Sequence, residues 1–190
     1  MAIAMNARYK LSDSLRLIRS IKTSGTITPS SKVLIDSLLG PINFSIARCI
    51  VELGPGNGCV TRALLDKMRP DSLLVCFEVN QEFISELQAL NDPRLWIVNR
   101  CASSIREALE DLGIEEVDHV ISSLPLALID GSLREDILSS VDSNLRTGGR
   151  FMQYQYSLRN YSDMKSIFSK VKLDFTLRNM PPAIVYECTK

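Results

Sequence analysis

The 190-residue sequence predicts an α/β protein with a doubly wound, mostly parallel, seven-stranded sheet. From Cys49 onward, short apolar runs alternate with amphipathic stretches, which is the chain order of a parallel sheet covered by helices. A glycine-rich turn follows the first apolar run. The last two apolar runs are close enough in sequence to form an antiparallel hairpin at the sheet edge. Together these observations indicate one sheet domain preceded by a helical N-terminal segment.

The elements follow in order along the chain. We expect strands over 48–53, 72–79, 95–98, 117–122, 150–156, 173–177 and 184–188. Helical spacing of apolar residues predicts helices over 59–68, 81–90, 103–112, 132–145 and 162–171. Gly148 and Gly149 are expected to cap the C-terminus of the helix before them. Asn179, Pro181 and Pro182 are turn residues between the last two strands.

Residues 1–47 do not follow this alternation, so we expect an N-terminal segment over 1–47 and the sheet domain over 48–190. The segment is predicted to hold a helix over 11–22, a polar loop over 23–31 and a short helix over 32–39. Residues 1–32 contain one acidic residue, Asp13, and six basic residues: Arg8, Lys10, Arg16, Arg19, Lys22 and Lys32. A basic amphipathic helix can bind an anionic membrane surface, pack over the sheet as a lid, or bind RNA. The rest of the chain is net acidic and would repel the phosphate backbone of a nucleic acid, which argues against nucleic-acid binding.

Composition excludes several classes of protein. The 22 basic and 22 acidic residues cancel, and no apolar run approaches the ~20 residues that span a bilayer. No secretory signal is recognisable, and the five cysteines form no C-x-x-C pair, so we expect reduced thiols and a cytoplasmic location. The single histidine, His119, argues against a metal site, and none is expected.

The stretch from Val51 to Gly58 reads VELGPGNG, follows a predicted strand and opens a predicted helix. Glycines at 54, 56 and 58 permit a sharp turn and a close approach of the backbone to a ligand. No Lys-Ser/Thr pair follows, which excludes a P-loop. Glu78, at the end of the next strand, can accept hydrogen bonds from ribose hydroxyls. The alternative is a plain turn with a surface glutamate, but the combination favours a nucleotide-bearing cofactor.

The dinucleotide fingerprint G-x-G-x-x-G would need a third glycine where Cys59 stands. The form E-L-G-P-G-N-G instead resembles the first motif of class I S-adenosylmethionine-dependent methyltransferases. This resemblance implies a Rossmann-like methyltransferase fold, S-adenosylmethionine as cofactor and Glu78 on the ribose. Cys101 stands where the family has an acid for the adenine amine, and a thiol accepts hydrogen bonds poorly, so a backbone amide or a neighbouring side chain is expected to take that role. The expected cofactor contacts are Thr28, Ser30, Ser31, Glu52, Gly54, Gly56, Gly58, Glu78, Cys101, Ala102 and Ser122.

Three hydroxyl residues, Thr28, Ser30 and Ser31, precede the short helix over 32–39. Capping of that helix would by itself explain them. The family resemblance also implies that they meet the methionine carboxylate of the cofactor.

The loop after the fourth strand reads Ser-Ser-Leu-Pro-Leu over 122–126, where amino-group methyltransferases carry their catalytic loop. The resemblance therefore assigns catalysis to Ser123, Leu124 and Pro125. With KTSGTITPSS over 22–31 and NMPPA over 179–183, the chain resembles bacterial phospholipid N-methyltransferases. It also resembles ribosomal RNA adenine dimethyltransferases, which have Asn-Leu-Pro-Tyr in this loop, with the tyrosine stacking on the extruded base. Leu126 offers no such ring, which favours a flexible alkylamine.

Four tyrosines are candidates to contact the substrate, since a tyrosine ring can hold a methylated ammonium: Tyr9, Tyr154, Tyr156 and Tyr161. His119 precedes Ser123 by four strand residues, roughly 13 Å, so it is not expected to act as the base. The predicted function is N-methylation of an amino-phospholipid resembling phosphatidylethanolamine, at the inner membrane surface. The alternatives are RNA adenine N6-methylation and a non-catalytic cofactor-binding module.

Overall fold

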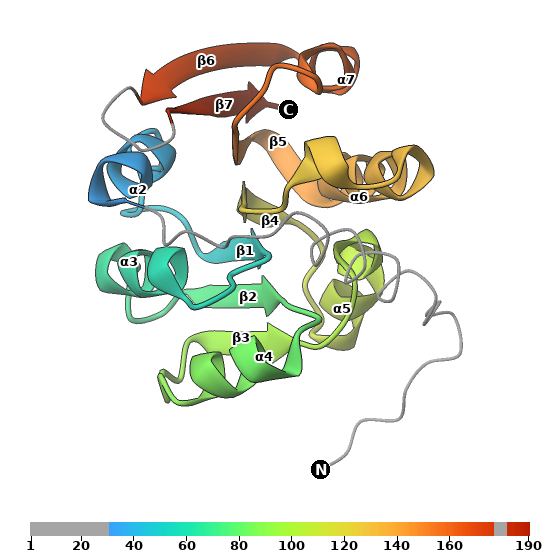
Figure 1. The fold of residues 1–190 in the computed structure, drawn as a ribbon. Coiled ribbons are helices and arrows are strands. Elements are labelled where there is room, and N and C mark those ends of the chain that lie inside the picture. The colour runs from blue at the N-terminus through green and yellow to red at the C-terminus, as the bar shows by residue number, and fades with distance from the viewer. Residues whose placement is uncertain (1–30, 177–181) are drawn as a thin grey trace.

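The computed structural model describes residues 31–176 and 182–190, which form a seven-stranded sheet with helices on both faces (Figure 1). The strands are β1 (Cys49–Leu53), β2 (Leu73–Phe77), β3 (Leu95–Val98), β4 (Val117–Ser122), β5 (Leu145–Gln155), β6 (Lys170–Thr176) and β7 (Ala183–Thr189). The helices are α2 (Lys32–Leu39), α3 (Cys59–Lys67), α4 (Gln81–Gln88), α5 (Ile105–Asp111), α6 (Gly131–Asn144) and α7 (Tyr161–Ile167), with 3₁₀ turns η1 (Ala102–Ser104) and η2 (Leu126–Leu128).

The strand order is β3-β2-β1-β4-β5-β7-β6. Strands β1 to β5 are parallel, and β7 is antiparallel to both β5 and β6. This arrangement confirms the predicted fold class, including the antiparallel C-terminal pair. Because the chain order reverses between β1 and β4, ligands of such a sheet bind beyond the carboxyl ends of these two strands.

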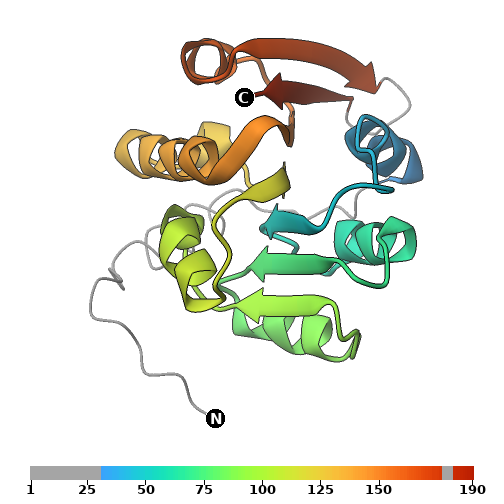
Figure 2. The ribbon, with the colours of Figure 1, turned by 180° about the vertical axis from the view of Figure 1, so that it is seen from behind.

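The sheet is covered on both faces, which Figure 2 shows from behind. Every residue of β1 is buried, as expected for a central parallel strand. Val51 and Leu53 point into a core shared with α5, α6 and α7. Ile50 points the other way, into a core shared with α2 and α3. One apolar layer therefore covers each face of the sheet.

Helix α2 begins where the sequence predicts. The Ser31 side chain accepts a hydrogen bond from the Leu34 backbone N–H at 3.2 Å, which confirms the expected cap. Leu34, Leu38 and Leu39 are buried against the sheet. The predicted helix over 11–22, together with Tyr9, Thr28, Ser30 and the hairpin turn at 179–181, lies outside the described residues.

Two expectations about local structure were wrong. Gly148 and Gly149 do not cap α6, which ends at Asn144, but lie inside β5. The cause is the pairing of β4 with β5: Val117 faces Leu145, yet His119 faces Arg150, so two steps along β4 correspond to five along β5. Gly148, at φ +72°, supplies the left-handed residue of this bulge.

The second wrong expectation is the end of α7, which stops at Ile167 rather than at residue 171. Val171 belongs to β6, where it pairs with Cys188 of β7. Pairing with a neighbouring strand therefore overrides helical spacing here.

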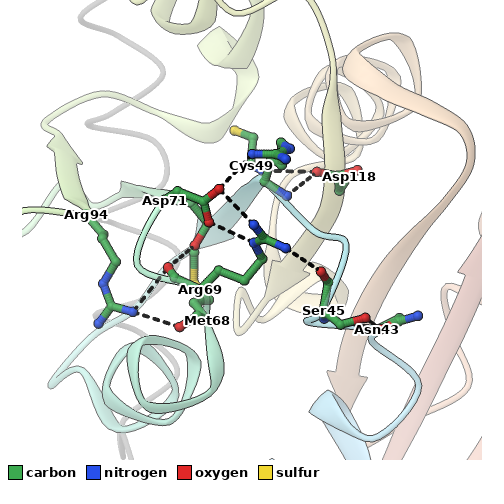
Figure 3. A network of polar contacts seen from close by, with 10 residues as sticks. Asn43, Ser45, Cys49, Met68, Arg69, Asp71, Arg94 and Asp118 are labelled. Carbon is green, nitrogen blue, oxygen red and sulfur yellow. Dashed lines mark hydrogen bonds and ion pairs between the residues drawn. The ribbon is translucent and has the colours of Figure 1, made fainter.

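Charged side chains gather at the amino ends of the strands, which we call the amino edge (Figure 3). Asp71, just before β2, pairs with Arg48 at 2.8 Å and with Arg69 at 2.7 Å. Arg69 also donates to the Ser45 carbonyl at 2.8 Å, and Arg94 donates to the Met68 carbonyl at 2.9 Å. These bonds fasten the loops before β1, β2 and β3 to one another.

Asp118 does the same for the start of β4. One of its oxygens accepts the backbone N–H groups of Arg48 at 2.7 Å and Cys49 at 3.0 Å, and the other accepts Arg146 Nε at 2.7 Å. Burial raises the pKa of Asp118, but these hydrogen bonds outweigh it and leave the pKa below its ordinary value. The hydrogen bonds at the amino edge thus favour the ionised form of Asp118, which holds the starts of β1 and β4 together.

Candidate active site

The glycine turn lies at the carboxyl end of β1. Gly54 and Gly56 have φ of +68° and +54°, a left-handed conformation that favours glycine. A Cβ on Gly54 would lie 2.7 Å from Cδ2 of Leu124, so this turn presses directly on the loop that follows β4. The structure thereby brings the predicted cofactor turn and the predicted catalytic loop into contact.

Glu78 follows β2 and is 6% exposed. Its Oε2 accepts the Gly56 N–H at 3.2 Å, and its Oε1 accepts the N–H groups of Val79 at 2.8 Å and Asn80 at 2.9 Å. The carboxylate therefore fixes the glycine turn against the end of β2. An ionised carboxylate has about four acceptor positions, so it retains capacity for a ribose hydroxyl. The pairing of a glycine turn with a fixed acid fits a nucleoside-bearing cofactor.

Cys101 and Ala102 follow β3 and are 0% and 2% exposed. The carbonyl of Cys101 accepts the backbone N–H of Ser104 at 3.0 Å and its hydroxyl at 2.8 Å, so it is engaged in starting η1. These residues end the third strand at the same edge as Glu78. Their contact with adenine stays a prediction.

Glu52 lies in β1, two residues before Gly54, and is close enough to Glu78 for the two carboxylates to repel each other. It is fully buried, and its Oε2 accepts hydrogen bonds from the Thr61 hydroxyl at 2.7 Å and the Cys76 thiol at 3.3 Å. Its Oε1 has no partner among the described residues. Burial raises the pKa of Glu52 to about 7, although the bonds from Thr61 and Cys76 lower it. The side chain thus lies in the protein interior, and a direct cofactor contact stays a prediction.

The loop over 122–126, which we call the acceptor loop, is held at several points. The Ser123 N–H donates to the Leu53 carbonyl at 2.9 Å, and the Leu124 N–H donates to the Ser122 hydroxyl at 3.2 Å. The Leu126 N–H donates back to the Leu124 carbonyl at 2.8 Å. Ser123 and Pro125 are half-buried, whereas Leu126 is fully buried. The loop therefore offers a fixed backbone and no titratable side chain.

The described tyrosines divide into two groups. Tyr154 and Tyr156, at the carboxyl end of β5, meet edge to face with ring centroids 6.0 Å apart, and Tyr156 is 51% exposed. Tyr161 lies on α7, with the Lys165 ammonium 5.6 Å from its ring centre. Strand β5 lies beside β4, the strand that leads into the acceptor loop. Tyr154 and Tyr156 are therefore better placed than Tyr161 to contact a substrate at that loop.

His119 pairs with Ile50 near the start of β4 and is 4% exposed. Burial lowers its pKa to about 4, so the imidazole is neutral at neutral pH. Its position on the strand agrees with the sequence interpretation that it is a strand residue and not the base.

Sequence reasoning missed Gln153. This residue of β5 is fully buried, and its Nε2 donates to the Leu124 carbonyl at 3.0 Å. The available signal was the polar pair Gln153 and Gln155 inside an otherwise apolar strand. Buried polar side chains need a reason, and here it lies in the acceptor loop.

A mostly parallel sheet with a glycine turn after β1, an acid after β2 and a proline-containing loop after β4 is typical of class I S-adenosylmethionine-dependent methyltransferases. Comparison with known proteins agrees. The chain is 30% identical over 172 residues to the ornithine lipid N-methyltransferase of Singulisphaera acidiphila, covering 86% of each protein. The chain therefore belongs to the family of that enzyme and is a methyltransferase that uses S-adenosylmethionine.

Other similarities are shorter or more distant. A stretch of 69 residues is 39% identical to ribosomal RNA small subunit methyltransferase H of Aromatoleum aromaticum, covering 36% of this chain and 22% of that protein. The fold matches 1,6-didemethyltoxoflavin-N1-methyltransferase of Burkholderia thailandensis with a TM-score of 0.68 at 13% identity, covering 100% of this chain and 93% of that chain. It matches precorrin-6y C5,15-methyltransferase of Geobacter metallireducens with a TM-score of 0.64 at 15% identity, covering 86% and 93%. No protein-family model matches the sequence.

Proposed function

We propose that this protein methylates the amine of a lipid head group at a membrane surface. The observation that carries the proposal is Leu126, an aliphatic and fully buried side chain at the loop position where base-methylating relatives place a stacking tyrosine. The full-length similarity to a lipid N-methyltransferase supports the same substrate class. A head group with a primary amine, such as that of phosphatidylethanolamine or an ornithine lipid, fits it.

Bound S-adenosylmethionine supplies an activated sulfonium methyl group, so the protein's task is alignment and exclusion of water. The glycine turn and Glu78 would hold the nucleoside, and the acceptor loop would direct the amine. The attacking nitrogen must be neutral. Since the loop has no titratable side chain and His119 lies at the far end of β4, the proton leaves to solvent.

Exposed apolar side chains at the carboxyl ends of the strands support a membrane orientation. They are Leu128, Tyr156, Leu158 and Phe175, which are 49–56% exposed, and we call them the apolar edge. Leu128 directly follows the acceptor loop, Tyr156 and Leu158 follow β5, and Phe175 lies at the end of the edge strand β6. A lipid whose chains stay in the bilayer would reach the loop from this side. Among residues 31–176 and 182–190, no helix is long and apolar enough to cross a bilayer.

RNA methylation is the second candidate, favoured by the 69-residue similarity to a ribosomal RNA methyltransferase. Labelled S-adenosylmethionine distinguishes the two. The protein is incubated with phosphatidylglycerol vesicles that carry ornithine lipid or phosphatidylethanolamine, and separately with ribosomal RNA. We expect label in a lipid amine. Label in RNA with none in either lipid would overturn the proposal.

A further inference from the structure

We propose that Gln153 is a positioning residue for methyl transfer: it fixes the Leu124 carbonyl and, through it, the direction of the acceptor loop. The inference rests on the proposed function only in assuming that this loop receives the amine. Gln153 lies in β5, in register with Ser122 of β4 and Tyr186 of β7. It is fully buried, and its amide donates both to the Leu124 carbonyl at 3.0 Å and to the Tyr154 carbonyl.

The hydrogen-bonding needs of Leu124 do not explain this contact. Its carbonyl already accepts the Leu126 N–H at 2.8 Å, so removing Gln153 would leave no orphaned carbonyl. Gln153 itself carries a penalty, because its Oε1 is buried without a partner in the part of the chain that the structure describes. An apolar residue at 153 would avoid that penalty. A buried glutamine here is therefore explained by what it does to the loop.

The contact links the loop to the cofactor turn. Leu124 packs against Gly54, where a Cβ would come within 2.7 Å of Leu124 Cδ2. The bonds of Ser123 to Leu53 and of Leu124 to Ser122 hold the loop from β1 and β4, and Gln153 holds it from β5. With three strands fixing it, a shift of Leu124 would move Ser123 and Pro125 relative to the glycine turn. Misplacement by about 1 Å can cost roughly 10²-fold in rate.

The matched test compares Gln153→Leu with Gln155→Leu. Gln155 lies two residues along the same strand on the same face, is 4% exposed, and its Nε2 has no partner among the described residues. On ornithine-lipid vesicles we expect Gln153→Leu to lower kcat by roughly 10- to 100-fold. S-adenosylhomocysteine affinity and Tm should stay close to those of Gln155→Leu. Equal kcat in the two variants, or a loss of affinity or Tm that accounts for the fall, would overturn the proposal.

Gln153→Glu gives a second readout at nearly constant size. A glutamic acid can donate to the Leu124 carbonyl only when protonated. The ratio of its kcat to that of the unmodified protein should therefore rise as pH falls. A ratio that does not change with pH would count against the positioning role.

Hydrogen exchange separates this inference from the substrate assignment. In Gln153→Leu, exchange of the Ser123 and Leu126 amides should quicken by about fivefold or more, the effect of one net hydrogen bond, while Gln155→Leu should leave them unchanged. Unchanged exchange in Gln153→Leu refutes the Gln153 role whatever the acceptor. Faster exchange without methylation of any lipid supports the Gln153 role and refutes only the proposed function.

Discussion

The two ends of the sheet shift the pKa of a buried or half-buried carboxylate in opposite directions. At the amino edge, Asp118 accepts two backbone N–H groups and an arginine, and its pKa lies below the ordinary value. At the carboxyl end of β1, Glu52 has a hydroxyl and a thiol as partners, and burial raises its pKa to about 7. The surroundings therefore stabilise the ionised form of Asp118 and destabilise the ionised form of Glu52.

The contrast extends to neighbouring groups. Asp71, Arg48 and Arg69 neutralise one another at the amino edge. At the carboxyl ends of the strands, which we call the carboxyl edge, Gln153 buries an amide oxygen without a partner among the described residues. His119, buried and with an unpaired Nδ1 among the described residues, lies near the start of β4, so unpaired groups alone do not separate the two edges. The glycine turn, Glu78 and the acceptor loop do, because all three lie at the carboxyl edge. We infer that the amino edge stabilises the sheet and the carboxyl edge performs the chemistry.

The largest effect is expected from Gly54→Ala, with Gly148→Ala as its control. Both glycines have left-handed φ, near +70°, so both variants carry similar backbone strain of about 1–2 kcal/mol. Only at Gly54 would the new methyl group meet Leu124, at 2.7 Å; Gly148 has nothing within 4 Å. Methyl transfer should fall roughly 100-fold in Gly54→Ala and stay near normal in Gly148→Ala. Equal activities of the two variants would contradict the assignment of the chemistry to the carboxyl ends of the strands.

Glu52→Gln tests the destabilised carboxylate. The pKa of Glu52 is about 7 in the folded protein and 4.5 in the unfolded chain, so Glu52 ionises first in the unfolded chain. The contribution of Glu52 to stability therefore falls as pH rises from 4.5 to 7. Above pH 7 the penalty is complete, at about 3 kcal/mol. The variant should lose this pH dependence and be more stable at pH 8 than the unmodified protein. Urea unfolding at pH 4.5 and pH 8 measures it; a variant with the same pH dependence contradicts it.

Asp118→Ala tests the stabilised carboxylate. Loss of an ionised acceptor for two backbone N–H groups should lower stability by about 2 kcal/mol at neutral pH. Because the folded pKa is lowered, this contribution exists above the unfolded pKa and disappears as pH falls through the folded one. The kcat of the folded protein should not change. Glu116→Ala, exposed on the approach to the same strand, is the control and should leave stability unchanged.

The smallest effect concerns the membrane. Leu158→Ser on the apolar edge should weaken binding to anionic vesicles by roughly fivefold, the loss of about 1 kcal/mol of apolar contact. Ile46→Ser, which alters a 58% exposed side chain between α2 and β1, should not change it. Sedimentation with phosphatidylglycerol vesicles measures both, and equal losses would place the contact elsewhere.

The fold and most of the carboxyl edge could be predicted because their signals are local. Apolar runs mark β3 and β4 at their observed bounds, and the glycines at 54–58 mark the turn. Gly148 misled because a bulge in strand pairing depends on the partner strand. Gln153 was missed because its partner is a carbonyl 29 residues away. The burial of Glu52 depends likewise on Thr61 and Cys76, which only the fold brings together.

The most direct test is a titration of the unmodified protein with S-adenosylhomocysteine, followed through backbone amide chemical shifts. We predict the largest shifts at 54–58, 78–80 and 122–126, with smaller ones at 101–102. Amides of the amino edge at Arg48, Asp71 and Asp118 should not move. Shifts concentrated at the amino edge, or no saturable shift at the glycine turn, would contradict the assignment of chemistry to the carboxyl edge.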